Sequence, residues 1–325
     1  MRFLKDIILK NKKKYVKAHN YLENNEYHKA LELFNYLLDI NYNSFFVLFN
    51  LIKIHKEYDS LDILLNKINV LMDNNDYDYY ELLIHKGYIF YLKKEFDKSI
   101  NCFDEILIHD SNNLWANFYK AKVLYELNEE CDYIRLCNLI KNNNADYYLL
   151  LLVGEFFLEL NILDCALFCF DKSIKKHSKN HTAWRDKGMV LSLMKKYCES
   201  IDSYNNSLKL KNDYIVWDLK GRSYYCMDDY ENSLKCFDES LNLCPHNLSA
   251  LKNKMVLLFE INSLEESLNY CEKIFQIYED DIDVWNLKLE ILQKLKRYDE
   301  LNFVYKKAKE KFHDTSRLKK INKIQ

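Results

Sequence analysis

Apolar side chains recur along this chain at helical spacing, in stretches of about fourteen residues separated by short polar runs. In residues 214–247, for example, Trp217, Gly221 and Tyr224 are spaced by four and three residues, which places them on one face of a helix. A second stretch follows at once and contains Ser233 and Phe237. The pattern predicts two amphipathic helices joined by a short turn.

The same pair of stretches returns along the chain at intervals of 33 to 35 residues. The four glycines of the protein all fall on the position of Gly221, and the one proline, Pro245, closes a copy. The positions equivalent to Gly221 are Ala18, Ile52, Gly87, Ala121, Gly154, Gly188, Gly221, Met255 and Leu289. Sixteen residues after each of them come Phe34, Ile68, Phe103, Cys137, Phe170, Tyr204, Phe237, Cys271 and Tyr305.

Residues 217–245 resemble a tetratricopeptide repeat, a 34-residue helix–turn–helix with the pattern W-x2-L-G-x2-Y, then A-x3-F, then P. Trp217, Gly221, Tyr224, Phe237 and Pro245 match it, while Lys220 replaces the usual Leu and Ser233 the usual Ala. The resemblance extends over about nine tandem repeats that cover residues 11–315. It implies an all-α fold, an α-α superhelix (solenoid) of about nine antiparallel helix-turn-helix hairpins.

The repeats occupy nearly the whole chain and leave room for only a short segment at each end. We expect residues 1–10 to form an amphipathic cap with Phe3, Leu4, Ile7 and Ile8 facing inward, and residues 316–325 to form a basic cap or a frayed tail. The second and fourth repeats depart furthest from the pattern, through ordinary drift or because a hinge lies near residue 140. The expected repeats are 11–44, 45–79, 80–113, 114–146, 147–180, 181–213, 214–247, 248–281 and 282–315.

The glycines suggest a close crossing inside each hairpin, since glycine in a helix costs about 0.5–1 kcal/mol relative to alanine. In the family, this small position of the first helix packs against a small position of the second. The sequence supplies such pairs in the middle of the chain, and large pairs such as Ile52/Leu64 and Leu289/Leu301 elsewhere. We expect the hairpins with large pairs to open wider. The small pairs are Gly87/Ser99, Gly154/Ala166, Gly188/Ser200 and Gly221/Ser233.

Composition favours a well-buried helical protein: 49% of residues are hydrophobic and 30% are charged. The net charge of −2 conceals basic ends, because residues 1–17 and 306–325 each carry +6, which leaves −14 for the residues between them. An acidic middle repels the phosphate backbone and therefore argues against nucleic acid as a ligand. Neither a secretory signal nor an apolar run long enough to span a membrane is visible, so we expect a cytoplasmic location and no membrane.

Catalytic, cofactor and metal motifs are missing from the sequence. Four isolated glycines cannot form a dinucleotide- or phosphate-binding loop, and the cysteines include no C-x2-C pair. His177 and His181 flank one repeat junction without Cys or carboxylate partners at metal spacing. The expectation is a protein that is not an enzyme and has no cofactor and no metal.

In the family, a concave groove is lined by positions 2, 5, 9, 12 and 13 of the first helix. Contiguous aromatic side chains on such a face mark an interface. We expect the groove to bind a peptide or helix of a partner protein, so that the chain acts as an interaction scaffold or adaptor. If the groove is closed, the same rings pack on neighbouring repeats instead. The candidate groove residues are Phe46, Phe49, Lys53, Tyr88, Tyr91, Trp115, Phe118, Lys122, Tyr125, Tyr148, Arg185 and Arg222.

Two other functions stay open at this point. Helical-hairpin arrays of similar period read single-stranded RNA, although this sequence has no regular basic stripe. A self-assembling solenoid is the other alternative, opposed by the like charge of the two ends. One subfamily holds carboxylates with Lys and Asn at positions 5 and 9, then Lys and Arg two repeats later. That clamp is absent here, because no position 9 holds Asn. The partner's identity and the oligomeric state do not follow from the sequence.

Overall fold

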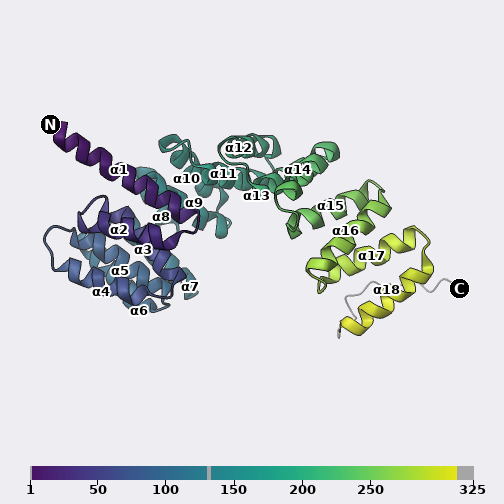
Figure 1. Cartoon of the computed structure of the whole chain (residues 1–325), viewed down its shortest axis with the longest axis horizontal. Helices are drawn as coiled ribbons and strands as arrows, with labels where there is room; N and C mark the ends of the chain where they lie inside the picture. Colours follow the sequence, from purple (N-terminus) through teal and green to yellow (C-terminus); the bar gives the residue numbers. More distant parts are fainter. Residues whose placement is uncertain (1, 130–132, 313–325) are drawn as a thin grey trace. The chain divides into compact units, whose positions relative to one another are not determined.

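The computed structural model describes residues 2–129 and 133–312, with side chains from residue 8 onward. Every regular element in these residues is an α-helix, and successive helices pack in pairs (Figure 1). The protein is therefore an all-α array of helical hairpins, as the sequence predicts. We call the first helix of each pair helix A and the second helix B.

The chain divides into two compact units, Met1–Ala145 and Asp146–Gln325. The division follows directly on the asparagine run at 142–144, at the end of the weak fourth repeat. The first unit contains α1 (Arg2–Glu23), α2 (Tyr27–Asp39), α3 (Ser44–Glu57), α4 (Leu61–Met72), α5 (Tyr79–Leu92), α6 (Phe96–His109), α7 (Leu114–Glu126) and α8 (Tyr133–Asn142). The second contains α9 (Tyr147–Glu159), α10 (Leu163–Lys176), α11 (His181–Leu193), α12 (Tyr197–Leu210), α13 (Tyr214–Tyr225), α14 (Tyr230–Leu243), α15 (Leu248–Glu260), α16 (Leu264–Ile277), α17 (Ile282–Lys294) and α18 (Tyr298–Lys311).

The expected N-terminal cap is not a separate element. Helix α1 runs unbroken from Arg2 to Glu23, so residues 2–10 extend the first helix A. The side chain of Ile8 is 58% exposed, which corrects the expectation that it faces inward. The basic segment 316–325 lies outside the described residues.

Each turn from helix A to helix B contains a residue in the left-handed conformation, a place where glycine is usually favoured. This chain uses Asn, Asp or Lys there instead, for example Lys195 with φ 61°. The residue after it bonds back into helix A: the Lys196 N–H donates to the Leu191 carbonyl over 2.8 Å. Since Asn, Asp and Lys take the left-handed positions, the glycines of this chain are not needed in these turns.

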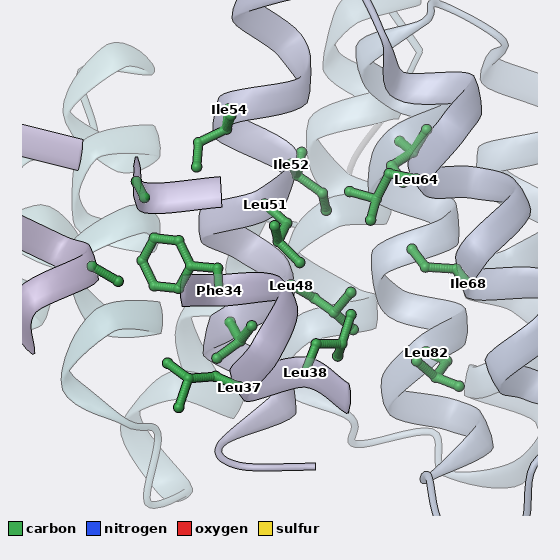
Figure 2. Packing of buried hydrophobic residues seen from close by; sticks show 14 residues of the cluster. Phe34, Leu37, Leu38, Leu48, Leu51, Ile52, Ile54, Leu64, Ile68 and Leu82 are labelled. Carbon is green, nitrogen blue, oxygen red and sulfur yellow. The ribbon is translucent and has the colours of Figure 1, made fainter. Parts of the chain in front are cut away.

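In the first unit, a cluster of buried apolar side chains lies between successive helices (Figure 2). Phe34 and Leu38 of α2 face Leu48 and Leu51 of α3, and Leu64 of α4 lies beyond Ile52. All of these residues are at most 1% exposed. The apolar faces predicted by the helical spacing are therefore the faces that pack.

The glycines lie where an aromatic ring of helix B crosses helix A. A Cβ atom added to Gly188 would lie 2.5 Å from Cε1 of Tyr204, and one added to Gly87 would lie 2.7 Å from Cε1 of Phe103. The expected small partner also contacts the glycine, because the Ser200 hydroxyl donates to the Gly188 carbonyl over 2.8 Å. Equivalent bonds join Ser99 to Gly87, Ser233 to Gly221 and Ser267 to Met255.

The hairpins with large residues at the crossing are the more open ones, as predicted. The helices of the glycine hairpins, such as α11 with α12, lie close together along most of their length. In α3 with α4 and in α17 with α18 the close approach is shorter. In these two hairpins both residues at the crossing are large, whereas α15 and α16 still pack closely with Met255 at the crossing, because its partner Ser267 is small.

Ion pairs at a constant interval of sixteen residues join helix B of one repeat to helix A of the next. Lys187 of α11 binds Asp171 of α10 over 2.7 Å. The same register pairs Lys120 with Asp104, Lys254 with Asp238 and Lys288 with Glu272. The first three acidic residues belong to the Cys-Phe-Asp runs, which recur at intervals of 67 residues. These ion pairs therefore explain the aspartate of each run.

We expect Asn180→Ala to lower the free energy of unfolding by about 1 kcal/mol. Asn180 is the N-cap of α11, and its Oδ1 accepts hydrogen bonds from the backbone N–H groups of Thr182 and Ala183 at 3.0 and 3.3 Å. Urea unfolding followed by far-UV circular dichroism measures the effect. Lys196→Ala is the matched control, since Lys196 is the N-cap of α12 and makes no side-chain cap bond. Equal unfolding curves for the two variants would contradict the prediction.

Candidate functional site

The candidate groove residues lie on the A helices. Those at position 5 of helix A are largely buried. Phe49 and Phe118 occupy position 5 in α3 and α7 and are 4% and 1% exposed. The expectation that their rings face a groove is therefore wrong. Position 5 stands three residues before the small position at the crossing, so its side chain turns toward the packed face. Other buried residues at this position are Ile84, Leu151 and Asp218.

In the first unit, rings from α3, α5 and α7 pack together in what we call the aromatic cluster. The Phe49 ring lies 4.5 Å from His85 and 5.0 Å from Trp115, measured between ring centroids. Tyr88 stacks on Tyr119 at 4.7 Å. One edge of the cluster reaches the surface. The cluster consists of Phe45, Phe46, Phe49, His85, Tyr88, Trp115 and Tyr119.

The other candidates of the first unit keep part of their surface accessible. The Tyr91 hydroxyl donates to Glu126 over 3.2 Å, and the Lys122 ammonium lies 5.9 Å from the Tyr91 ring centroid. Lys53 and Tyr125 are exposed, Tyr125 by 37%. The half-buried candidates are Phe46, Tyr88, Tyr91, Trp115 and Lys122. The structure thus brings together aromatic candidates from three successive A helices.

His85 is buried at the centre of the aromatic cluster, with Phe45 at 4.8 Å and Phe49 at 4.5 Å. Neither ring nitrogen has a hydrogen-bond partner among the described residues. Burial lowers the pKa of His85 to about 3, because the imidazolium would lie without water or a counter-charge. The side chain is therefore a neutral part of the core at physiological pH.

In the second unit, two cations of the helix A surface are engaged in ion pairs. The Arg185 Nε donates to Asp186 Oδ1 over 2.7 Å, and Asp186 is 3% exposed. Burial raises the pKa of Asp186, an effect opposed by Arg185. Lys252 binds Asp281. Arg185 is consequently engaged inside its own helix and is a weaker candidate for contact with a partner.

Two side-chain networks connect α13 with α15. The buried carboxylate of Asp218 accepts from the Ser249 hydroxyl at 2.6 Å and from the Asn253 amide at 2.9 Å. The Tyr225 hydroxyl donates to Glu260 over 2.6 Å, and this bond to a carboxylate raises the pKa of Tyr225 to about 12. These bonds fix the neighbouring helices and their side chains in one register.

Arg222 differs from Arg185 and Lys252, the paired cations described above. It is exposed on α13, and no hydrogen bond or ion pair joins its guanidinium to the side chains that the structure describes. A cavity of about 260 Å³ lies beside it, lined by Arg222, Tyr225, Cys226, Phe237, Asn253 and Val256. Tyr148, the remaining candidate, is half-buried at the start of α9.

Sequence reasoning missed the contribution of position 6 of helix A. His85, Tyr119, Asp186 and Asn253 all occupy it, and each is a central member of one of the clusters above. The signal was available, because a polar or aromatic residue recurs there at repeat spacing beside apolar neighbours. The family positions used for the prediction do not include it.

A search of the described residues for three or more His, Cys, Asp or Glu side chains close enough to hold a metal ion returns none. In the same residues, no helix combines the length and the apolar content that a membrane crossing requires.

Consecutive helical hairpins that return every 33 to 35 residues define an α-helical repeat protein of the solenoid class. No protein-family model matches the chain. The chain is 24% identical over 235 residues to a TPR repeat-containing protein of Methanocaldococcus jannaschii. This match agrees with the repeat motif and the hairpin fold, so in both sequence and fold the chain is similar to tetratricopeptide-repeat proteins.

Two more similarities concern proteins of larger assemblies. The chain is 25% identical over 178 residues to the N-alpha-acetyltransferase 16, NatA auxiliary subunit, of Mus musculus, a match that covers 42% of this chain. The crystal structure of the APC/C hetero-tetramer Cut9-Hcn1 superposes with a TM-score of 0.56 at 14% identity, covering 82% of this chain and 52% of that one. The matched region spans 40% of the archaeal relative and 21% of the mouse relative.

Proposed function

We propose that the protein is a non-enzymatic scaffold whose helix A surface binds a peptide or helix of a partner protein. The observation that carries this proposal is the edge of the aromatic cluster in the first unit. There Phe46, Tyr88 and Trp115, from three successive A helices, remain only half-buried. Contiguous aromatic surface is costly in water and supplies much of the binding energy at protein interfaces.

The arrangement of the rings also fits an extended or helical ligand. Each A helix presents one or two rings, and neighbouring packed helices lie about 8–10 Å apart. A bound segment that crosses α3, α5 and α7 therefore meets a ring at each helix. Such a ligand needs no chemistry from the protein, which agrees with a binding role.

A selection from a random peptide display library on the purified chain tests the proposal. We expect the selected peptides to bind Tyr88→Ala about tenfold more weakly or worse, because an aromatic at the centre of an interface contributes about 1.4 kcal/mol or more. Fluorescence anisotropy with labelled peptides measures the change.

Ile108→Ala is the matched control, since Ile108 lies on the B helix α6 of the same unit and is 87% exposed. Far-UV circular dichroism verifies that both variants are folded. Peptides that bind the wild type and both variants equally would place the binding surface elsewhere. A selection that yields no binding peptide, or a preference for a labelled single-stranded RNA, would refute the proposal.

A further inference from the structure

We propose that Arg222 and the cavity beside it recognise an acidic side chain adjacent to a large apolar side chain in the bound segment. This inference rests on the proposed function and adds the chemistry of the partner. It concerns the surface formed by α13, α14 and α15 of the second unit.

The charge argument starts from the state of the neighbouring ionic groups. Arg185 is paired with Asp186, and Lys252 with Asp281, so these cations are already neutralised. Arg222 keeps its guanidinium exposed, with no ion pair to a described residue. A guanidinium offers a planar fork of N–H donors that matches a carboxylate in two parallel hydrogen bonds. The exposed guanidinium of Arg222 therefore fits an acidic group of the ligand.

The nearby carboxylates favour Arg222 as the place where the acidic group of the ligand binds. Asp218 is occupied by Ser249 and Asn253, and Glu260 by the Tyr225 hydroxyl. Their hydrogen bonds hold them in place without using Arg222. Their negative charge disfavours a ligand carboxylate elsewhere on this surface, so an acidic side chain is directed to Arg222.

The cavity supplies the apolar half of the recognition. Its volume of about 260 Å³ is enough for one large side chain and too small for a folded element. The walls include the buried ring of Phe237 and the partly exposed side chain of Val256. Asn253 is fixed at its edge by the bond to Asp218. Because Arg222 is itself a lining residue, the acidic and apolar groups of the ligand must be neighbours.

The experiment uses acetylated dodecapeptides that are identical except for a central pair, which is Leu-Glu, Leu-Gln, Ala-Glu or Ala-Gln. Each peptide is made with an amidated and with a free C-terminus. Binding to the full chain is measured by fluorescence anisotropy. We expect the amidated Leu-Glu peptide to bind about tenfold more tightly than either single replacement.

Three variants assign the effects to their residues. Arg222→Gln should abolish the preference for Glu over Gln, and Val256→Trp, which fills the cavity, should abolish the preference for Leu over Ala. Lys175→Gln is the control, because it removes one positive charge from an exposed position on the B helix α10. It should leave both preferences unchanged.

The outcomes separate this inference from the proposed function. If Arg222→Gln leaves the Glu preference intact, or if only peptides with a free C-terminal carboxylate bind, the inference is overturned. If these dodecapeptides fail to bind while the display-selected peptides still depend on Tyr88, the inference falls and the proposed function stands. If neither kind of peptide binds, both fall.

Discussion

Replacing Gly188 by alanine is expected to destabilise the protein by about 2 kcal/mol, although glycine-to-alanine changes in helices usually stabilise. Alanine has the higher helix propensity by about 1 kcal/mol, so an unconstrained site would gain. Here the new Cβ would lie 2.5 Å from Cε1 and 2.7 Å from Cδ1 of Tyr204. Tyr204 is 1% exposed, so its ring cannot move out of the way without disturbing the core.

The first hairpin shows how a methyl group at this crossing affects the packing of the two helices. Ala18 stands there opposite Phe34, and α1 and α2 approach closely over a shorter stretch than α11 and α12. A Gly188→Ala variant must therefore open its hairpin and lose part of that contact. The stability is measured as the urea midpoint of unfolding by far-UV circular dichroism.

A smaller partner provides the control for the Gly188 prediction. In a Tyr204→Leu background the added methyl group meets a smaller, more adaptable side chain, so Gly188→Ala should cost much less. If the stability effects of the two substitutions are not additive in this way, the cost of Gly188→Ala arises from the contact with Tyr204. A single variant that unfolds at the same or a higher urea concentration than the wild type would show that the crossing tolerates a Cβ.

The second large effect expected is a loss of about 2.5 kcal/mol in the free energy of unfolding between pH 7.5 and pH 4.5, caused by His85 alone. In the folded chain the pKa of His85 is about 3, against an ordinary value of 6.5. Between these two values the unfolded chain binds a proton that the folded chain refuses. The stability contribution is thus fully present above pH 6.5 and is lost as the pH falls toward 3.

His85→Leu measures this contribution by difference, because other groups also titrate in this range. The leucine is of similar size, carries no unsatisfied nitrogen and cannot be protonated. We expect it to raise the stability at pH 7.5 by about 1 kcal/mol, since a buried polar group without a partner is removed. The variant should also lose 2.5 kcal/mol less than the wild type on acidification. Parallel pH profiles for the two proteins would show that His85 is hydrated or hydrogen-bonded in solution.

The helical spacing and the repeat interval were sufficient to predict the all-α hairpin fold and the place of the glycines. Both depend on local geometry, because a helix has one period and a close crossing tolerates only a small residue. The prediction that the hairpins with two large residues at the crossing, Ile52/Leu64 and Leu289/Leu301, open wider was confirmed for the same reason. What the sequence did not reveal is that the aromatic residue sixteen positions later fills the space above each glycine.

The site was predicted less well, because the exposure of a residue depends on its neighbours in adjacent repeats. Position 5 was assumed to face outward, yet Phe49 and Phe118 are buried. The pairing of Arg185 with its sequence neighbour Asp186 could not be distinguished in advance from the unpaired state of Arg222. Arg185 has an acidic neighbour in sequence and Arg222 has none, but adjacent residues on a helix do not usually face each other, so the sequence did not predict that pair. The binding role of the remaining candidates stays a prediction.

The lysine–carboxylate pairs described above also bear on how such a chain can grow. Lys120, Lys187 and Lys254 are 67 residues apart, as are Gly87, Gly154 and Gly221, so the chain repeats itself in steps of two hairpins. A duplicated 67-residue segment carries the lysine, its acidic partner and the glycine crossing together. Each end of the inserted copy then contacts a helix surface equivalent to the one that it contacted before the duplication. Duplication of such a segment therefore preserves these ion pairs and glycine crossings at the new junctions.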